Sequence, residues 1–152
     1  AVADLDIGAY DIVYFAGGWG AAFDLGFSDA VGEKVTQANA AGKVIGGVCH
    51  GPLGLLRATG PDGRPLVEGR RVSAVTDKQV RELGIETTPH HPETELRLLG
   101  ADFRCRHRRR DPLANHWEVD GNLVTGQNQN AGPMVAREMM KLLAAEGDRS
   151  VT

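Results

Sequence analysis

The segment Gly47-Val48-Cys49-His50-Gly51 contains the residues whose types and spacing could do chemistry. The thiol of Cys49 is followed directly by the imidazole of His50, so a nucleophile and a proton-transfer group are neighbours. Small residues around a nucleophile are typical of an elbow, a sharp turn that lifts the side chain above the end of a strand. A helix after this turn would lower the thiol pKa, and its free N–H groups would bind an oxyanion. The alternative is an inert, buried cysteine beside a structural histidine.

A second glycine-rich segment, Gly17-Gly18-Trp19-Gly20, follows an apolar run at residues 11–16. If both runs are parallel strands, this segment lies beside the cysteine turn at the same edge of the sheet. We therefore expect Gly17, Gly18, Trp19 and Gly51 to form an oxyanion and substrate pocket, with a donor from the Gly18 or Trp19 amide. The segment lacks the G-x-G-x-x-G spacing and a phosphate-binding lysine, which argues against a nucleotide. No cofactor is expected.

The elements that must position these residues follow an α/β pattern. Residues 11–16 and 43–48 are apolar and rich in β-branched residues, as in buried parallel strands. A helix is predicted between them, with Ser28 as its cap and Gly42 as its end, and a second helix over residues 53–58. This alternation predicts parallel pairing.

The second half of the chain continues with shorter elements. We predict a strand over residues 70–76, helices over 77–83 and 92–99, and a hairpin over 116–125 that turns at Asp120-Gly121. The last helix places Val135, Met139, Leu142 and Leu143 on one face. The sequence has no internal repeat and no domain linker.

Composition limits the function classes. The chain has 152 residues, with 41% hydrophobic and 24% charged residues, which predicts one folded domain. Seventeen basic and twenty acidic residues give a net charge of -3, which argues against nucleic-acid or anionic-membrane partners. No apolar run reaches the length of a membrane helix. Two cysteines without a CxxC motif predict a reducing, cytoplasmic location.

Several segments together resemble the ThiJ/PfpI superfamily, relatives of the class I glutamine amidotransferases. They are AGGWGAAFDL, GVCHGP, DGRPLVEGRRVSAVTD, PHHPETELRLLGADF and VDGNLVTGQN, in this order, and they cover nearly the whole chain. The resemblance implies a flavodoxin-like three-layer α/β sandwich with a mostly parallel sheet. It also implies a nucleophile at Cys49, its neighbour at His50, and oxyanion donors at Gly18 and His50. Family activities include glyoxalase III-type conversion of methylglyoxal to lactate, isocyanide hydration, protease or deglycase activity, and chaperoning. The glyoxalase III-like, chaperone-type branch is the most similar.

The sequence departs from this family in two places. An acidic residue usually orients the histidine, but its position here falls near Gln79 and Val80, so Asp77 is the nearest carboxylate that could replace it, with Glu82 behind. The family also places a glutamate from its first βα unit against the cysteine, and that unit is missing. Residues 1–152 are therefore expected to be one amino-terminally incomplete domain. We expect a second polypeptide or a cleaved amino-terminal fragment to complete the sheet in an oligomer, because the strand at residues 12–15 would otherwise be an unpaired edge.

Other candidate residues carry weaker signals. His116-Trp117-Glu118 resembles part of a glutaminase triad. In those enzymes the pair lies between the last strand and the last helix, where this chain has Gln127-Asn128-Gln129, so a hairpin position is expected for His116. Adjacent His90 and His91 lack a third metal ligand, so no metal is predicted, and His90 is assigned to the pocket lining. Cys105 lies among arginines that would lower its thiol pKa, but it has no elbow. A solvated basic loop is the interpretation of this segment, residues 104–110.

Two classes of function follow. The first is a cysteine-dependent enzyme acting on a small reactive carbonyl compound, in which Cys49 adds to the aldehyde and His50 moves protons. The second is a non-catalytic, chaperone-like or interaction subunit that keeps the turn without a working site. A hydratase or amidase using the same cysteine is a third possibility. Thiol reactivity at neutral pH separates an activated cysteine from an inert one.

Overall fold

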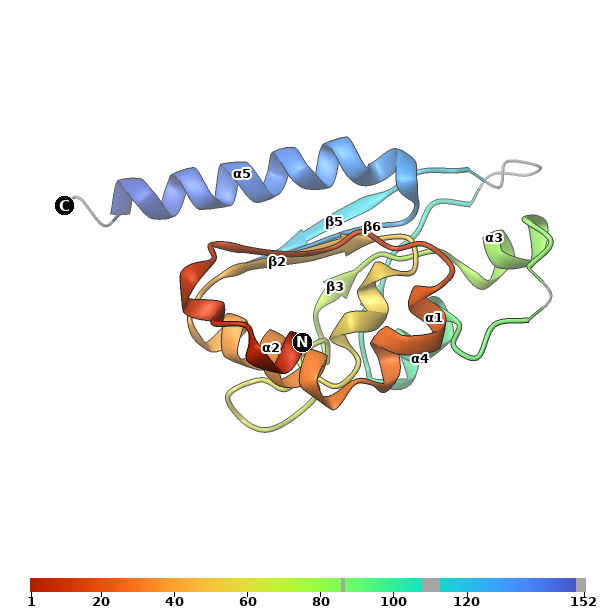
Figure 1. Cartoon of the computed structure of the whole chain (residues 1–152). Coiled ribbons are helices and arrows are strands. Elements are labelled where there is room, and N and C mark those ends of the chain that lie inside the picture. The colour runs from red at the N-terminus through yellow and green to blue at the C-terminus, as the bar shows by residue number, and fades with distance from the viewer. Residues whose placement is uncertain (86, 108–112, 150–152) are drawn as a thin grey trace.

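The computed structural model describes residues 1–85, 87–107 and 113–149, which form three layers (Figure 1). A four-stranded sheet in the order β1-β2-β6-β5 lies in the middle. Helix α5 (Gly132–Arg149) covers one face of the sheet. Helices α1 (Ala21–Asp24), α2 (Asp29–Ala40) and α4 (Pro92–Leu98) lie on the other side. The predicted flavodoxin-like α/β class is confirmed.

Parallel pairing in the central sheet agrees with the strand and helix order of the sequence. Strand β1 (Ile12–Phe15) pairs in parallel with β2 (Val44–Val48), and β2 pairs in parallel with β6 (Leu123–Gly126). Strand β5 (Trp117–Asp120) runs antiparallel to β6 and forms the predicted hairpin. Its turn contains Gly121 at a φ of +55°, a conformation that favours glycine. The carboxyl ends of β1 and β2 therefore lie side by side.

The predicted strand at residues 70–76 is shorter in the structure. Only β3 (Arg71–Val72) is paired, with β4 (Asp102–Phe103), in a separate two-stranded parallel sheet. Its continuation bonds to the central sheet instead, because the Ser73 amide donates to Oγ1 of Thr125 over 2.8 Å. This segment leads the chain toward the cysteine turn.

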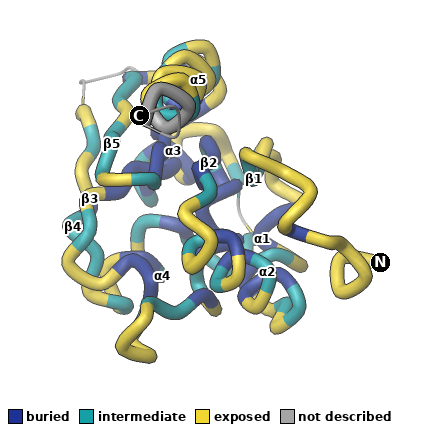
Figure 2. Tube along the Cα trace, turned by 90° about the vertical axis from the view of Figure 1, so that its left-hand side faces the viewer, coloured by how far each residue is buried: buried dark blue, intermediate teal, exposed yellow. Residues whose placement is uncertain are grey.

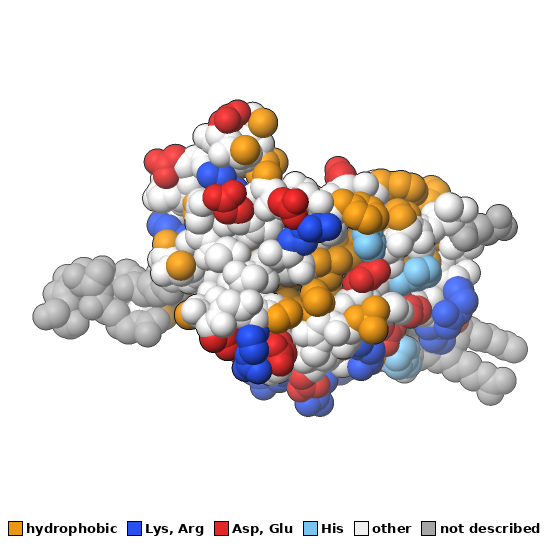
Figure 3. Space-filling view, turned by 90° about the horizontal axis from the view of Figure 1, so that it is seen from below, with side chains coloured by type: hydrophobic (Ala, Val, Ile, Leu, Met, Phe, Trp, Pro, Cys, Tyr) orange, Lys and Arg blue, Asp and Glu red, His pale blue; other side chains and the backbone are white. Residues whose placement is uncertain are grey.

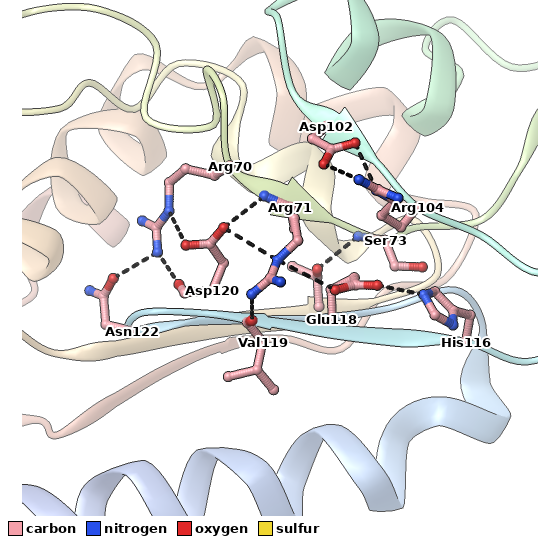
Figure 4. A network of polar contacts seen from close by, with 11 residues as sticks. Arg70, Arg71, Ser73, Asp102, Arg104, His116, Glu118, Val119, Asp120 and Asn122 are labelled. Atoms are coloured by element: carbon pink, nitrogen blue, oxygen red, sulfur yellow. Dashed lines mark hydrogen bonds and ion pairs between the residues drawn. The ribbon is translucent and has the colours of Figure 1, made fainter.

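Charged side chains hold β3 against β5 (Figure 4). The Arg71 amide donates to the carboxylate of Asp120 over 2.9 Å, and the Arg71 guanidinium donates to the Val119 carbonyl over 2.8 Å. Arg70 binds both the Asp120 carbonyl and the Asn122 side chain. The network fixes the position of the segment that follows β3.

Helix caps agree with the sequence signals. Ser28 accepts a hydrogen bond from the Val31 amide at the start of α2. Helix α3 (Asp77–Glu82) begins with a capping box formed by Thr76 and Gln79. The predicted helix at residues 53–58 is instead a 3₁₀ helix, η4 (Gly51–Leu55). The described residues contain four further 3₁₀ turns, for which the sequence carries no clear signal: η1 (Val2–Asp4), η2 (Ile7–Ala9), η3 (Leu25–Phe27) and η5 (Gln129–Ala131).

Two apolar clusters form the core, one on each face of the sheet. Ile45 and Val35 belong to the larger cluster, between the sheet and the short helices. The smaller cluster lies between the sheet and α5, with Val44 from β2 and Val135 and Met139 from α5. None of the helices in the described part of the chain is long and apolar enough to cross a membrane.

Candidate functional site

Cys49 lies at a sharp turn between β2 and η4. Its φ of +60° is in the left-handed region, which no other non-glycine residue within 1–85, 87–107 and 113–149 adopts. The Cys49 amide donates to the Gly126 carbonyl and its carbonyl accepts from the Val75 amide, each over 3.0 Å. Left-handed backbone costs energy at a residue with a Cβ, and it persists where neighbouring bonds hold it. The backbone geometry is that of a nucleophile elbow.

Two glycines let the end of β1 pack against this turn. A Cβ at Gly17 would lie 2.4 Å from the carbonyl oxygen of Val48, and Gly17 has a φ of +86°. A Cβ at Gly51 would lie 2.3 Å from the carbonyl oxygen of Phe15. Both distances are shorter than van der Waals contact, so these positions require glycine. The structure therefore brings Gly17 and Gly51 together with Cys49, as the parallel arrangement predicts.

The sulfur of Cys49 lies within reach of three polar groups. Nδ1 of His50 is 3.5 Å from Sγ, and the backbone amides of His50 and Gly18 both donate to the thiol. The Trp19 carbonyl accepts from the Ala22 amide, and the predicted place of Trp19 in the oxyanion and substrate pocket stays a prediction. The amides of Gly18 and His50 thus converge on the half-buried sulfur.

The thiol pKa moves in the direction opposite to the prediction. Burial raises the pKa of Cys49, and this effect exceeds the lowering by the amides of His50 and Gly18. The expectation of a lowered thiol pKa is therefore wrong for residues 1–152. The physical reason is that the turn leads into the five-residue 3₁₀ helix η4 rather than an α-helix, while the thiol loses much of its hydration.

The imidazole of His50 is buried, with 2% of the residue exposed. Burial is the larger cause that lowers the pKa of His50, and the nearby charge of His91 lowers this pKa further. Its Nε2 atom is buried without a hydrogen-bond partner among the described residues. A neutral ring with Nδ1 toward the sulfur can accept the thiol proton, and in this tautomer the hydrogen on Nε2 is unsatisfied both before and after the transfer.

Asp77 lies at the start of α3, two residues after the Val75 amide that binds Cys49. Its Oδ2 accepts a hydrogen bond from Oγ1 of Thr94 over 2.6 Å, and its amide donates to Glu93. Its Oδ1 lies 3.8 Å from Nδ1 of His91, and both atoms are buried without hydrogen-bond partners. Within the described structure, no hydrogen bond joins Asp77 to His50. The predicted ring-orienting contact is therefore not formed here.

The positions at which relatives were expected to place an acidic residue are uncharged and buried. Gln79 accepts from the Thr76 amide and donates to the Ala114 carbonyl, while Val80 belongs to the buried core. Sequence reasoning missed the group around Asp77, namely His91, Glu93 and Thr94. The sequence carried one signal, because Pro92 and Glu93 mark a helix start that would bring these side chains to a single helix end.

His90 belongs to an aromatic patch rather than to the sulfur contacts. Its Nδ1 lies 2.7 Å from Oε1 of Glu95, and its ring lies 4.0 Å from the ring of Phe27, centroid to centroid. Trp19 packs edge-on against Phe23 with a centroid distance of 5.8 Å. Hydrophobic side chains gather beside histidines on the face seen from below (Figure 3). The contacts of His90 do not extend to Cys49, so its predicted role in the pocket lining remains a prediction.

The weaker candidates have other partners. His116 precedes β5 and pairs with Glu118 over 2.7 Å, in the network that holds β3 (Figure 4). Nε2 of His107 lies 3.1 Å from Sγ of Cys105. Burial and Glu93 raise the pKa of Cys105, so the expected lowering by arginines is wrong. Arginines 108–110 lie outside the described residues. In the rest of the chain, no three histidine, cysteine or acidic side chains are grouped to hold a metal.

The sequence of the chain matches a known protein family. The model of the DJ-1/PfpI family matches residues 1–142. The chain belongs to this family. The matched residues include the elbow at Cys49, the parallel strands of the central sheet and both glycine-rich turns.

The curated relatives include proteins named as glyoxalases. Glutathione-independent glyoxalase hsp3101 from Schizosaccharomyces pombe is 28% identical over 139 residues, or 86% of this chain and 56% of that protein. Glyoxalase 3 from Candida albicans is 26% identical over 140 residues, or 90% of this chain and 59% of that protein. The chain thus spans somewhat more than half the length of these relatives.

Solved structures support the same fold. Glyoxalase III from Candida albicans superposes with a TM-score of 0.77 at 26% identity, covering 93% of this chain and 60% of that one. Rapid Encystment Protein 24 KDa from Francisella tularensis has a TM-score of 0.86 at 24% identity, covering 94% and 62%. The second likeness concerns the fold alone.

Proposed function

We propose that the chain carries the nucleophile of a cysteine-dependent, glutathione-independent glyoxalase, which converts methylglyoxal and similar small carbonyl compounds to hydroxy acids. The observation that carries this proposal is the contact between Sγ of Cys49 and Nδ1 of His50 at a left-handed turn. The glyoxalase names of the relatives support the substrate class. The proposed conversion of methylglyoxal to lactate needs no cofactor, because the substrate is oxidised at one carbon and reduced at the next.

The first step is addition to the aldehyde carbon. His50 is neutral because its pKa is lowered, so it can take the proton of the Cys49 thiol as the sulfur attacks. A carbon–sulfur bond forms, and the aldehyde oxygen receives the proton from His50. The product is a hemithioacetal. The amides of Gly18 and His50, which converge on the sulfur, are placed to stabilise the developing oxyanion.

The second step is an internal redox exchange. His50 removes the proton from the former aldehyde carbon and returns it to the neighbouring carbonyl carbon, while the hydroxyl proton moves to the second oxygen. The first carbon is oxidised to a thioester and the second is reduced to an alcohol, so no external oxidant is needed. Water then cleaves the carbon–sulfur bond, which releases lactate and restores the thiol.

Asp77 is proposed as the group that compensates the charge of His50 during these transfers. The tautomer that accepts a proton at Nδ1 carries its hydrogen on the buried Nε2, and transfer from the thiol adds a positive charge to a ring whose Nε2–H has no acceptor among the described residues. The carboxylate of Asp77 has a buried oxygen without a hydrogen-bond partner and lies beside His91, whose charge acts on His50. In this arrangement Asp77 is a positioning residue and not a group that touches the substrate.

The test measures lactate formed from methylglyoxal without glutathione. We expect Cys49→Ala and Cys49→Ser to reduce the rate to background, since both remove the thiol nucleophile. Cys105→Ala is the matched control and should keep the rate within about twofold, because Cys105 lies outside the site. Undiminished turnover by Cys49→Ala would discard the mechanism.

A non-catalytic, chaperone-like or interaction subunit is the second candidate function. Two observations favour it: the pKa of Cys49 is raised, and Nε2 of His50 has no hydrogen-bond partner among the described residues. In that case the unmodified chain would form no lactate under any condition, and Cys49→Ala would retain whatever binding the chain has. A hydratase or amidase would instead turn over an isocyanide or amide and would lose that activity in Cys49→Ala.

A further inference from the structure

The hydroxyl of Thr125 joins two segments that meet at the cysteine turn. Thr125 belongs to β6 and is completely buried. Its Oγ1 atom accepts a hydrogen bond from the Ser73 amide over 2.8 Å (Figure 4). Ser73 follows β3, which lies beside β5 on the side of the sheet away from β1 (Figure 2). Because residues 73–76 have no strand pairing, the Thr125 hydroxyl serves this segment in place of a strand carbonyl.

This bond is close in sequence to both hydrogen bonds of the Cys49 backbone. The carbonyl of Cys49 accepts from the amide of Val75, two residues after Ser73. The amide of Cys49 donates to the carbonyl of Gly126, the residue after Thr125. Both bonds measure 3.0 Å and hold a residue whose φ is +60°. Thr125 therefore connects the two segments that support the left-handed backbone of the cysteine.

The segment at residues 73–76 depends on this hydroxyl because it is completely buried. A buried amide that loses its acceptor is strongly unfavourable, so the segment would have to move until the Ser73 amide finds another acceptor. A movement at Ser73 reaches Val75 within two residues and weakens its bond to the Cys49 carbonyl. The strained backbone of Cys49 would then lose one of its two supports.

We propose that Thr125 is a positioning residue for Cys49, because its hydroxyl fixes the segment that holds the cysteine turn. This turn brings the amides of Gly18 and His50 to the sulfur. For catalysis the inference rests on the proposed function, since a displaced sulfur would add more slowly to the aldehyde. The support of the turn itself does not depend on any activity.

The test replaces Thr125 with valine, which has nearly the same shape and lacks the hydroxyl. The variant should fold, because the backbone pairing of β6 with β2 and β5 does not involve this side chain. Hydrogen exchange followed by NMR should become about tenfold faster at the amides of Ser73, Val75 and Cys49. Unchanged exchange at Cys49 would overturn the proposal, whatever the effect at Ser73, because the change would not have reached the turn.

Thr36→Val is the matched control. The hydroxyl of Thr36 also accepts from the backbone amide of a distant segment, that of Thr59, over 2.9 Å, and it joins α2 to the residues after η4. Both variants should unfold at lower urea concentrations, since each leaves a backbone amide without its acceptor. Only Thr125→Val should accelerate exchange at Cys49. Equal acceleration in the two variants would indicate a general loss of stability and contradict the proposal.

The kinetics of methylglyoxal conversion give a second readout. We expect Thr125→Val to lower kcat about tenfold and to keep KM within about twofold, because a displaced nucleophile slows the chemical step. Thr36→Val should keep kcat within about twofold, and Thr125→Ser should recover most of kcat because it retains the hydroxyl. In an active chain, full kcat in Thr125→Val or no recovery in Thr125→Ser would overturn the positioning role. If the unmodified chain forms no lactate, the proposed function fails, and the exchange comparison decides the positioning role.

Exchange in the unmodified chain gives a test that does not depend on how the valine variant folds. If one local opening releases the segment and the turn together, urea concentrations below the unfolding transition should accelerate exchange at Ser73, Val75 and Cys49 by the same factor. A different factor at Cys49 than at Ser73 would show that the two open separately and would refute the proposal.

Discussion

Nδ1 of His50 lies 3.5 Å from Sγ of Cys49, while Nε2 of the same ring is buried without a hydrogen-bond partner. Burial raises the pKa of the thiol and lowers the pKa of the imidazole. Both shifts favour the uncharged pair of thiol and neutral ring over the pair of thiolate and imidazolium. The resting site is therefore expected to hold its proton on sulfur and to transfer it only as a substrate adds.

Alkylation of Cys49 should be slow at neutral pH. Because the thiol pKa is raised, the thiolate forms only at higher pH than in a solvated thiol, and the thiolate is the reacting species. The measurement is the rate of reaction with iodoacetamide as a function of pH in a Cys105→Ala background, so that only Cys49 reacts. The half-maximal rate should fall at a higher pH than for N-acetylcysteine under the same conditions. A plateau reached at or below neutral pH would contradict the uncharged pair.

Stability should fall as the pH is lowered, in part because of His50. Because the pKa of His50 is lowered in the folded state, the unfolded chain binds this proton at a higher pH than the folded chain does. The free energy of unfolding is therefore unaffected by His50 above the ordinary pKa of 6.5 and decreases as the pH falls below it. Urea midpoints from about pH 7.5 to about pH 5 should therefore decrease more steeply for the unmodified chain than for His50→Gln. His107→Gln, at an exposed position, is the control and should keep the steep dependence. Parallel curves for the unmodified chain and His50→Gln would refute this origin.

Much of the site could be predicted from the sequence because its geometry is backbone geometry. Glycines around Cys49 and the run Gly17-Gly18 occur where two parallel strands end, and parallel strands bring their ends together. The same arrangement left the Gly18 and Trp19 amides as alternative donors, and the family resemblance was needed to name Gly18 and His50. The start of α2 could be located from its capping residue Ser28, and the start of α4 from Pro92 in its first turn.

The electrostatic part could not be predicted, since it depends on burial and on contacts between distant segments. The thiol pKa depends on how much water the packed turn excludes, and the short η4 turn was mistaken for an α-helix. Gly51 and Gly54 disfavour the α-helix, and both pack closely against Phe15. The contact of Asp77 with Thr94 and His91 joins segments 14 to 17 positions apart, for which the sequence gives no pairing signal.

Gly17→Ala should strongly destabilise the elbow. A Cβ there would lie 2.4 Å from the Val48 carbonyl oxygen, and the φ of +86° is itself unfavourable for alanine. Overpacking and left-handed backbone together predict a loss of about 2–4 kcal/mol in the free energy of unfolding. Gly20→Ala is the matched control, because nothing lies within 4 Å of its added Cβ, and its effect should stay within about 0.5 kcal/mol. Denaturant titrations of both variants give the comparison, and equal stabilities would show that the close approach does not constrain the turn.

His91→Gln should raise the pKa of His50. Burial is the larger cause of the lowered pKa and remains in this variant, but the repulsion from His91 is removed. The measurement is an NMR titration of the His50 Hε1 resonance, with His107→Gln as the control that leaves this titration unchanged. An unchanged or lowered pKa in His91→Gln would contradict the electrostatic link between the two rings.

The same variant should change the pH profile of methylglyoxal conversion. Neutral His50 is the base that takes the thiol proton, so the acid limb of kcat/KM follows its deprotonation. If the pKa of His50 rises in His91→Gln, more of the ring is protonated at a given acidic pH, and the acid limb moves to higher pH. A purely structural role for His91 would lower the rate by the same factor at every pH and leave the limb in place. The position of the limb therefore separates an electrostatic role of His91 from support of the fold.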